Sequence, residues 1–338
     1  MKFILTIDTE ADNQWKHGIP LSTENIRYVP RFQQLCERYR IKPTYLVTSE
    51  VCEDASAKNI FKNYLEKGTA EIGAHLHSWT TPPFKDIEGM RFNDPNHPFA
   101  NELAESLLDQ KITNITLQIQ DSFGIAPTSF RSGRFGFDDI CAKLLVGHGY
   151  LVDSSVTPYV NWSGQRGLPS GSGGPNFVGF SNNHYFLNTE KGKLLEVPVT
   201  ILPTKWPLTA NESFARMYFT WKESLAKKIV RKLFVGRQPL WLRPYAWTTL
   251  PMLESIVAEA NRRSLQFITM MFHSSELMAG CSPYRRNESE IDLLYYLLEN
   301  FFLLLREMDV SPVTLTEAAL ELSRQDKIRL GQVSNATI

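Results

Sequence analysis

The sequence predicts an α/β protein in which parallel strands alternate with crossover helices, as either an open sheet or a closed (β/α) barrel. Short apolar runs rich in β-branched residues alternate with longer segments whose apolar residues recur at helical spacing. Several apolar runs end in a polar or charged side chain, such as Asp8 after the first run and His273 after a late one. No sharp linker divides the 338 residues, so we expect one domain over 1–324 and a C-terminal tail over 325–338.

The first three strands are predicted from short apolar segments that helical segments separate. A helix is expected over 24–38, where the preceding Ser/Thr pair can cap its start and Pro30 makes an early irregularity. A second helix, over 57–67, carries its apolar residues on one face and ends at Gly68. The strands themselves are expected at 2–7, 43–51 and 70–75.

The same unit repeats after a proline-containing loop over 80–98. A helix over 100–123 ends at Gly124, and a short strand then enters an Arg/Gly-rich turn within 127–138. A capped helix over 138–149 and a strand over 150–155 complete the repeat.

The second half begins with a segment rich in Gly, Ser, Pro and Asn over 158–183, which is typical of a loop. Residues 184–202 predict a hairpin that turns at 190–192, and we expect it to lie across a barrel mouth. One long helix is expected over 211–234. The last elements are strands at 239–245 and 265–277 and helices at 248–264, 288–308 and 314–324.

The composition excludes several classes of function. Lys plus Arg equals Asp plus Glu at 36 each, so the whole molecule has no field suited to binding nucleic acid. The four cysteines form no CxxC pair, and we expect them to be reduced in a cytoplasmic protein that starts at Met1. The apolar run before Asp8 is too short for a signal peptide, and no run of about 18 apolar residues could span a membrane. A GxGxxG motif does not follow the first strand.

Two histidines end the third predicted strand. Side chains two residues apart in an extended chain point to the same face, so His75 and His77 can reach one object together. A metal ion is the expected object, because imidazole is the commonest metal ligand. The alternative is that one or both are hydrogen-bonded core or turn histidines.

Other reactive side chains occupy equivalent places at the ends of predicted strands. They are Asp8, Glu10, His75, His77, Arg131, Arg134, Asp153, Arg243, His273 and Glu276. In a (β/α) barrel the C-terminal ends of the strands converge on one mouth, so these residues would meet there and form a hydrolytic metal site. The alternatives are a structural ion pair for the two arginines of the turn, a helix or turn cap for Asp153, and a cap or a partner of a catalytic residue for Glu276.

Five segments together resemble the polysaccharide deacetylase superfamily, the NodB homology domain of carbohydrate esterase family 4. They are TIDTE, EIGAHLHSWTTPP, FRSGRFGFD, VDSSVTP and MFHSSEL, and they look most like the WalW-type subgroup linked to bacterial surface-polysaccharide genes. The resemblance extends over residues 1–317. It implies a distorted (β/α) barrel of about seven parallel strands with a loop and β-hairpin insertion at 158–200.

The resemblance also implies a single divalent metal ion, usually zinc. Thr9 stands where the family has a metal-binding aspartate, and Trp79 stands where it has a second histidine. We therefore expect Glu10, His75 and His77 to hold the ion.

The remaining roles follow from the same resemblance. Asp8 matches the family's general base and Arg131 the arginine that keeps it ionised. His273 matches the histidine that protonates the leaving amine, and Asp153 would orient or tune that histidine.

The function implied is the removal of N-acetyl groups from a sugar in bacterial surface-polysaccharide biosynthesis. The substrate would be an N-acetylated saccharide, free, nucleotide-linked or lipid-linked, and the protein would act in the cytoplasm at the inner face of the membrane. The rivals are a metal-free or inactive barrel that binds glycan or scaffolds a biosynthetic complex, and an amidohydrolase barrel, which normally carries HxH on its first strand.

A basic amphipathic segment lies within the predicted helix 211–234. Its cations Lys227, Lys228, Arg231 and Lys232 stand opposite the apolar Trp221, Leu225, Ile229 and Leu233. The pattern favours a solvated basic face over a buried apolar stripe, with docking on a membrane surface as the alternative.

Overall fold

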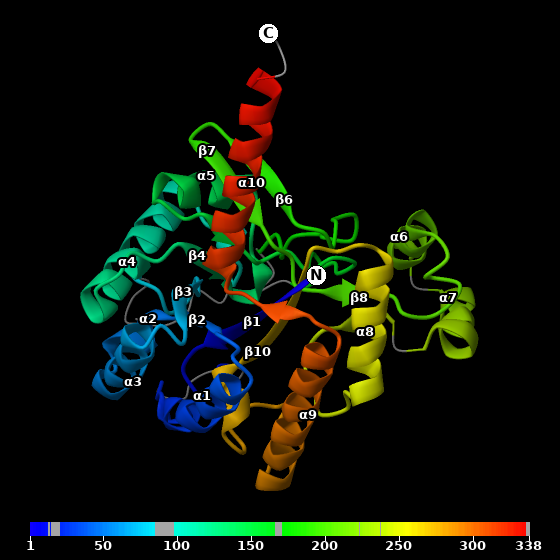
Figure 1. The fold of residues 1–338 in the computed structure, drawn as a ribbon, viewed down its shortest axis with the longest axis horizontal. Helices are drawn as coiled ribbons and strands as arrows, with labels where there is room; N and C mark the ends of the chain where they lie inside the picture. The colour runs from blue at the N-terminus through cyan, green and yellow to red at the C-terminus, as the bar shows by residue number, and fades with distance from the viewer. Residues whose placement is uncertain are drawn as a thin grey trace.

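The computed structural model describes residues 1–12, 14, 21–84, 98–165, 171–222, 224–236 and 238–335, apart from the side chains of 233, 234 and 326–335. Its central feature is a curled sheet around which most of the helices are arranged (Figure 1). The prediction of a distorted (β/α) barrel is confirmed.

Seven strands of the sheet run parallel to their neighbours. In sheet order they are β10 (Phe267–His273), β1 (Lys2–Thr9), β2 (Thr44–Val47), β3 (Glu71–Leu76), β4 (Ser129–Ser132), β5 (Val152–Asp153) and β7 (Gly192–Glu196). The antiparallel β6 (Tyr185–Thr189) forms one edge beside β7, and β11 (Ser311–Pro312) pairs with the start of β1. The number of parallel strands agrees with the seven expected.

The open side of the curled sheet is bridged by a small second sheet of β8 (Ile201–Leu202) and β9 (Leu240–Trp241). The Thr200 amide donates to the Thr269 carbonyl of β10 at 3.1 Å, and the Leu242 amide donates to the Thr200 carbonyl at 2.8 Å. These bonds join the chain that follows β7 to β10 and complete the distorted barrel.

Ten α-helices are described along these residues, and short helical turns accompany them. The α-helices are α1 (Val29–Arg38), α2 (Ser49–Glu53), α3 (Ala55–Glu66), α4 (Glu105–Phe123), α5 (Asp139–Gly147), α6 (Glu212–Thr220), α7 (Leu225–Val230), α8 (Leu250–Arg262), α9 (Glu288–Glu307) and α10 (Leu315–Asn335). The short turns are η1 (Glu24–Tyr28), η2 (Ala100–Glu102), η3 (Gly133–Phe135), η4 (Arg231–Val235) and η5 (Ser274–Leu277). Among the described residues, none of these helices has the length and apolarity needed to cross a membrane.

Side chains of β1 pack alternately into two different hydrophobic clusters. Phe3, Leu5 and Ile7 join the large cluster formed with the surrounding helices. Ile4 faces the other way, into an inner cluster that α10 completes with Leu315 and Leu322. Since side chains alternate along a strand, Asp8 lies on the same inward side as Ile4.

The helix α10 begins at the N-terminal ends of the strands. The Thr316 amide donates to the carboxylate of Glu71, the first residue of β3, and the Leu315 amide donates to the Thr44 hydroxyl at the start of β2. The inner cluster therefore fills this end of the barrel, and the C-terminal ends of the strands face the opposite side. We expected a tail from residue 325, but α10 continues past that position to Asn335.

Two elements differ from the prediction. The expected helix over 211–234 is divided into α6 and α7, because Trp221 adopts an extended ψ of 127° and the Ser224 side chain caps a new helix at the Lys227 amide. The predicted hairpin turn is present, but the hairpin is not laid across a mouth. Its second strand, β7, pairs parallel with β5 because both Leu194 and Leu195 are buried, as in an internal strand.

Candidate active site

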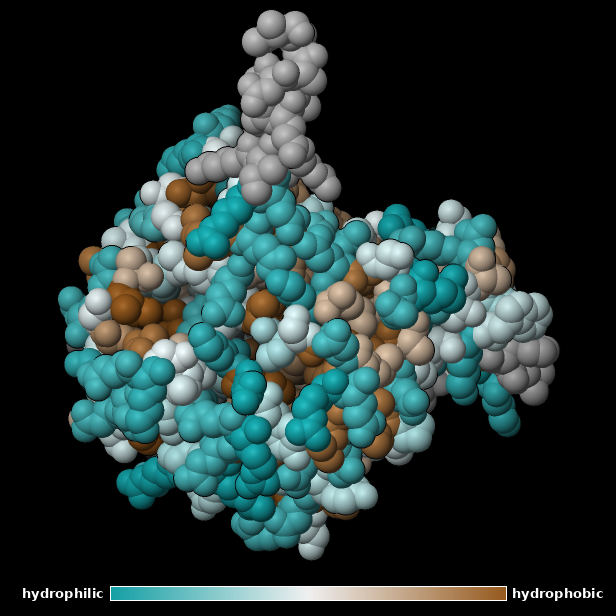
Figure 2. Space-filling view, viewed as in Figure 1, coloured by the Kyte–Doolittle hydropathy of each residue, from teal (hydrophilic) through white to brown (hydrophobic). Residues whose placement is uncertain are grey.

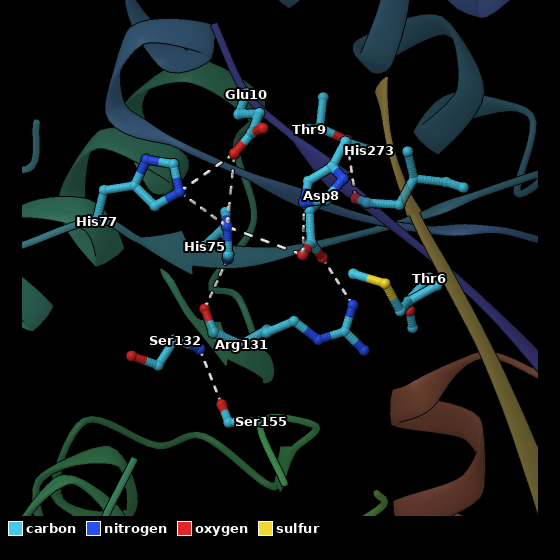
Figure 3. Close-up of polar contacts among 12 residues, drawn as sticks. Thr6, Asp8, Thr9, Glu10, His75, His77, Arg131, Ser132, Ser155 and His273 are labelled. Atoms are coloured by element: carbon cyan, nitrogen blue, oxygen red, sulfur yellow. Dashed lines mark hydrogen bonds and ion pairs between the residues drawn. The ribbon is translucent and has the colours of Figure 1, made fainter. Parts of the chain in front are cut away.

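The candidate site begins where β1 and β10 end side by side. Asp8 stands opposite His273 in the parallel register of the two strands, and Glu10 follows two residues after Asp8. Figure 3 shows these three side chains directed toward His75 from β3. Both carboxylates are buried. The structure therefore brings together at one pole of the barrel residues that lie more than 260 positions apart.

His75 is oriented by the neighbouring strand. Its Nδ1 lies 2.9 Å from the Arg131 carbonyl of β4, which can only accept, so Nδ1 carries the proton. Its Nε2 lone pair then faces inward, 3.0 Å from Nε2 of His77 and 3.9 Å from Oε2 of Glu10. Burial lowers the pKa of each imidazole to about 4, so both rings are neutral near pH 7.

The donor atoms of Glu10, His75 and His77 fit one metal ion. They lie within 4.8 Å of one another, and Glu10 Oε2 is 3.2 Å from His77 Nε2. Donor atoms placed tetrahedrally about 2.0–2.2 Å from zinc are about 3.3–3.6 Å apart, which is close to this spacing. Two neutral imidazoles and a carboxylate are also the donor chemistry that zinc and related divalent ions prefer.

Two neighbours fix the position of His77. The Trp79 indole stacks on its ring, with centroids 4.2 Å apart and an interplanar angle of 18°. On another side, a Cβ added at Gly133 would lie 2.4 Å from His77 Cδ2. The Trp79 Nε1 donates to Gln14 at 3.1 Å, which holds the indole in turn. Trp79, which stands where the resemblance implies a second histidine, therefore packs against His77 instead of supplying a ligand.

Arg131 holds Asp8 in the ionised state. Its Nη1 donates to Asp8 Oδ1 at 2.7 Å, and its Nε and Nη2 donate to the carbonyl and hydroxyl of Ser154. Burial by itself would raise the pKa of Asp8, but the charge of Arg131 and its hydrogen bond to Oδ1 outweigh burial and hold the pKa well below its usual range. Asp8 Oδ2 is directed to the donor cluster and lies 4.0 Å from His75 Nε2.

His273 faces Asp8 from the other side. Its Nε2 is 4.0 Å from Asp8 Oδ2, while its Nδ1 is 3.0 Å from both Glu276 Oε1 and Arg243 Nη2. Arg243 and Glu276 also form a buried pair at 2.6 Å. Burial opposes ionisation of Glu276, but Arg243 and His273 outweigh it and lower its pKa to about 2. Both residues were noted at strand ends in the sequence, but their joint contact with His273 was not foreseen.

Asp153 does not orient His273 as expected. Its carboxylate accepts from the Ser155 amide and hydroxyl, each at 2.8 Å, and it pairs across the sheet with Glu196 of β7. The reason lies in the sheet order, since β5 is separated from β10 by four strands on one side. Burial raises the pKa of both carboxyl groups, and the charge of Asp153 raises the pKa of Glu196 further. Arg134 is also outside the cluster, since it bonds Gln165 at 3.3 Å.

Comparisons with known proteins support the fold at low sequence identity. No protein-family model and no curated protein matches the sequence. A crystal structure described as a polysaccharide deacetylase, from Mycobacterium smegmatis, is 14% identical with a TM-score of 0.53, over 96% of this chain and 92% of that one. The present chain has that fold.

Two further solved structures are more distant. A family 4 acetyl xylan esterase from Clostridium thermocellum, in complex with a cobalt ion, is 14% identical with a TM-score of 0.40 and covers 95% of this chain and 91% of that one. A CE4 family pseudoenzyme from Bacillus anthracis is 11% identical with a TM-score of 0.43, over 94% and 65%.

Proposed function

We propose that the protein is a metal-dependent carbohydrate N-deacetylase. The observation that carries the proposal is the convergence of an arginine-bound carboxylate, a histidine and three metal-donor atoms at one end of the barrel. Asp8 Oδ2 stands between His273 Nε2 and His75 Nε2, 4.0 Å from each. A base, an acid and a cation-binding cluster are the parts that hydrolysis of an amide requires.

Glu10, His75 and His77 would hold the ion, and we propose zinc. When bound, a divalent ion supplies Lewis acidity, which polarises an acyl carbonyl and makes a water molecule more acidic. Glu10 bears the only carboxylate of this donor set, and burial raises its pKa when no cation is near. A cation would therefore stabilise the charged form of Glu10.

Asp8 and His273 would carry the protons. Arg131 occupies Oδ1 of Asp8, so Oδ2 is left to take a proton as the water oxygen adds to the acyl carbon. His273, held at Nδ1 by Glu276 and Arg243, would direct its Nε2 proton to the amine nitrogen as the carbon–nitrogen bond breaks. The products are acetate and a free amine, and the positioning role expected of Asp153 passes to Glu276 and Arg243.

The finer assignments remain part of this proposal. They are the WalW-type subgroup, an N-acetylated saccharide substrate of surface-polysaccharide biosynthesis, its nucleotide or lipid linkage, and a cytoplasmic location at the inner face of the membrane. The resemblance of the five sequence segments supports them.

A second candidate function is a metal-free barrel that binds glycan. The observation that favours it is the direct contact between the two imidazoles, whose Nε2 atoms lie 3.0 Å apart and can form a hydrogen bond without any ion. The absence of a carboxylate at Thr9 points the same way. Metal content distinguishes the two candidates before any activity is measured.

The test combines metal content with acetate release from N-acetylated oligosaccharides. We expect purified wild type to bind about one zinc equivalent and to release acetate. The Asp8→Asn variant should keep the metal and lose roughly 10²–10⁴-fold in kcat, because it removes the general base. The His75→Ala variant should lose both metal and activity.

His148→Ala is the matched control, because His148 lies away from the site and bonds Asp109. It should behave as wild type. Equal acetate release by wild type, Asp8→Asn and His75→Ala would end the catalytic assignment, and a wild type that binds no metal but retains glycan would establish the second candidate.

A further inference from the structure

The helix α6 presents apolar side chains on two faces. One face packs on the barrel through Ala215 and Tyr218, which join a buried cluster with Val199 and Met271. The other face carries Phe214, Met217 and, at its end, Trp221, with the i, i+3, i+7 spacing of a single helical stripe. All three side chains are exposed, Met217 to 59%. A helix that is already packed on the barrel therefore has a second apolar stripe in solvent.

Further exposed apolar side chains lie on either side of α6 in the sequence. Leu225 and Ile229, one turn apart on α7, are 76% and 50% exposed, and Trp206, in the segment before α6, is 74% exposed. We call this set the α6–α7 face; its members are Trp206, Phe214, Met217, Trp221, Leu225 and Ile229. Seventeen large apolar side chains are exposed among the described residues, and these six lie within 24 consecutive positions, so they are not the usual scatter of single exposed residues.

The burial of this segment differs in part from the one that the amphipathic pattern favoured: Lys228, Arg231 and Lys232 are exposed as expected. Leu225 and Ile229, expected in the interior, are exposed, while Lys227 is buried. The Lys227 Nζ donates to the Trp221 carbonyl and lies 5.5 Å from the centre of the Tyr218 ring. The lysine stem thus fills the inner side of α7, and that side leaves no place for the leucine and isoleucine.

Cationic side chains surround the α6–α7 face. Residues 203–238 contain eight Lys or Arg and two Asp or Glu, in a chain with 36 of each kind. The rest of the chain is therefore net acidic, and the positive charge is concentrated here. The described basic residues with exposed side chains in this segment are Lys205, Lys222, Lys228, Arg231 and Lys232.

The segment projects from the barrel beside the C-terminal end of α8, where Arg262 donates to the Thr209 carbonyl at 2.9 Å. It leaves β8, which follows the C-terminal end of β7, and it returns in β9. Figure 1 shows α6 and α7 set off from the barrel beyond α8, and on the side drawn in Figure 2 this projection is mainly hydrophilic to neutral with small apolar areas. Since α8 leads into β10, this contact lies toward the end of β10 that is away from His273 and the candidate site.

We propose that the α6–α7 face docks on an anionic membrane surface. Apolar side chains that enter the headgroup region, exposed tryptophans and a rim of Lys and Arg are the combination that binds such a surface, because the cations are attracted to anionic lipids. The concentration of positive charge in an otherwise acidic chain favours an anionic bilayer over a second copy of this chain, since two such faces would repel each other.

The docking does not depend on the proposed function. Vesicle binding and acetate release are separate measurements, so failure of one is distinguishable from failure of the other.

The experiment is flotation of the full chain with vesicles of phosphatidylcholine, with and without phosphatidylglycerol. Wild type should float with the anionic vesicles, less with neutral ones, and less again at high salt. The double variant Leu225→Glu, Ile229→Glu should bind at least about tenfold more weakly, because it removes apolar area and adds like charge. Lys222→Glu, Lys228→Glu should weaken binding by about fivefold or more for each cation lost.

Matched controls come from a different helix. Leu293 and Tyr296 of α9 are 61% and 70% exposed, and Leu293→Glu, Tyr296→Glu should leave vesicle binding unchanged. Thermal unfolding of each variant should match wild type, because every substituted side chain is exposed. Wild type that does not bind anionic vesicles overturns the proposal, and so does binding that the α6–α7 substitutions leave unchanged. A wild-type dimer that Leu225→Glu, Ile229→Glu turns into a monomer, with no vesicle binding, would assign the face to a second copy.

Discussion

The Trp79 side chain fixes the orientation of the His77 ring. The indole covers one face of the imidazole at 4.2 Å, and the Gln14 amide holds the indole through its Nε1. The His77 Nδ1 is buried and makes no hydrogen bond with any described residue. In metal-binding histidines the N–H of that second nitrogen usually donates a hydrogen bond to a carboxylate or a carbonyl, which fixes the ring. Stacking on Trp79 replaces that bond in this chain.

Replacing the indole should therefore weaken metal binding. We expect Trp79→Ala to raise the Kd for zinc by about 10–100-fold, the range seen when a side chain supporting a metal ligand is removed. Trp79→Phe keeps an aromatic ring against His77 and should retain most of the affinity. Competition with a chromophoric chelator measures Kd without any substrate. Equal affinities of wild type and Trp79→Ala would show that His77 does not depend on the stack.

The residues of the site were predictable to different degrees. Asp8, Glu10, His75 and His77 were found because strand alternation and a strand end are local features of the chain. Arg131 and His273 were found at strand ends in the same way, and the resemblance implied the roles of all six residues. The role of Asp153 was wrong because it depends on which strands are neighbours, and Glu276 took that role from a position three residues beyond His273. Local sequence identifies which side chains reach the mouth, but sheet order decides which of them touch.

The short turn η3 follows β4 directly and packs against His77 of the donor cluster. It passes so close to His77 that a Cβ at Gly133 would lie 2.4 Å from the ring and 2.8 Å from the Leu76 carbonyl. The backbone carbonyl cannot move without disturbing β3, because Leu76 pairs with Ser132 in the sheet. A side chain at this position would therefore displace either the turn or the imidazole.

Gly133→Ala should consequently lower the free energy of unfolding by about 1–3 kcal/mol, as overpacking of an interior does, and weaken zinc binding. Gly179→Ala is the control, since a Cβ there meets nothing within 4 Å. It should unfold within about 0.5 kcal/mol of wild type. Urea titration followed by tryptophan fluorescence measures both. If Gly133→Ala matched Gly179→Ala in stability and in zinc affinity, the close approach would have no energetic consequence.

For residues 221–233 the prediction gave the helical spacing of the apolar residues but not the side of the helix that packs on the barrel. The apolar period of residues 221–233 does not specify which side meets the barrel. Tyr218 and Trp221 accept the buried Lys227 through a ring and a carbonyl, and these partners come from α6 and its end. The strands were easier to predict. A strand buried on both faces is apolar throughout, so no choice between two sides has to be made.

The closure of the whole barrel places two pairs of acidic groups in its interior. Near the mouth, Asp8 and Glu10 lie beside arginine and histidine side chains. On the opposite wall, Asp153 and Glu196 lie side by side on β5 and β7. Burial, followed by the charge of Asp153, raises the pKa of Glu196 well above its ordinary value of 4.5. The Val156 amide donates to Glu196 Oε1 at 3.1 Å, so the group is held in place in either protonation state.

The sign of the resulting pH dependence differs between Glu276 beside His273 and Glu196 on the opposite wall. Glu276 has a lowered pKa of about 2, so its contribution to stability is present above pH 4.5 and is lost as the pH falls toward 2. Glu196 has a raised pKa, so the folded protein holds a proton that the unfolded chain releases above about pH 4.5. The contribution of Glu196 is therefore lost as the pH rises through this window.

Glu196→Gln should remove that loss. A glutamine can accept the Val156 amide and donate to Asp153, as protonated Glu196 does, and it has no proton to release. We expect the variant and wild type to be about equally stable near pH 4.5. Above that, the variant should gain up to about 1.4 kcal/mol per pH unit until the raised pKa is reached. The exposed Glu307→Gln serves as the control and should follow wild type at every pH. Urea unfolding across this range measures the difference, and parallel curves for wild type and Glu196→Gln would mean that Glu196 is ionised in the folded barrel.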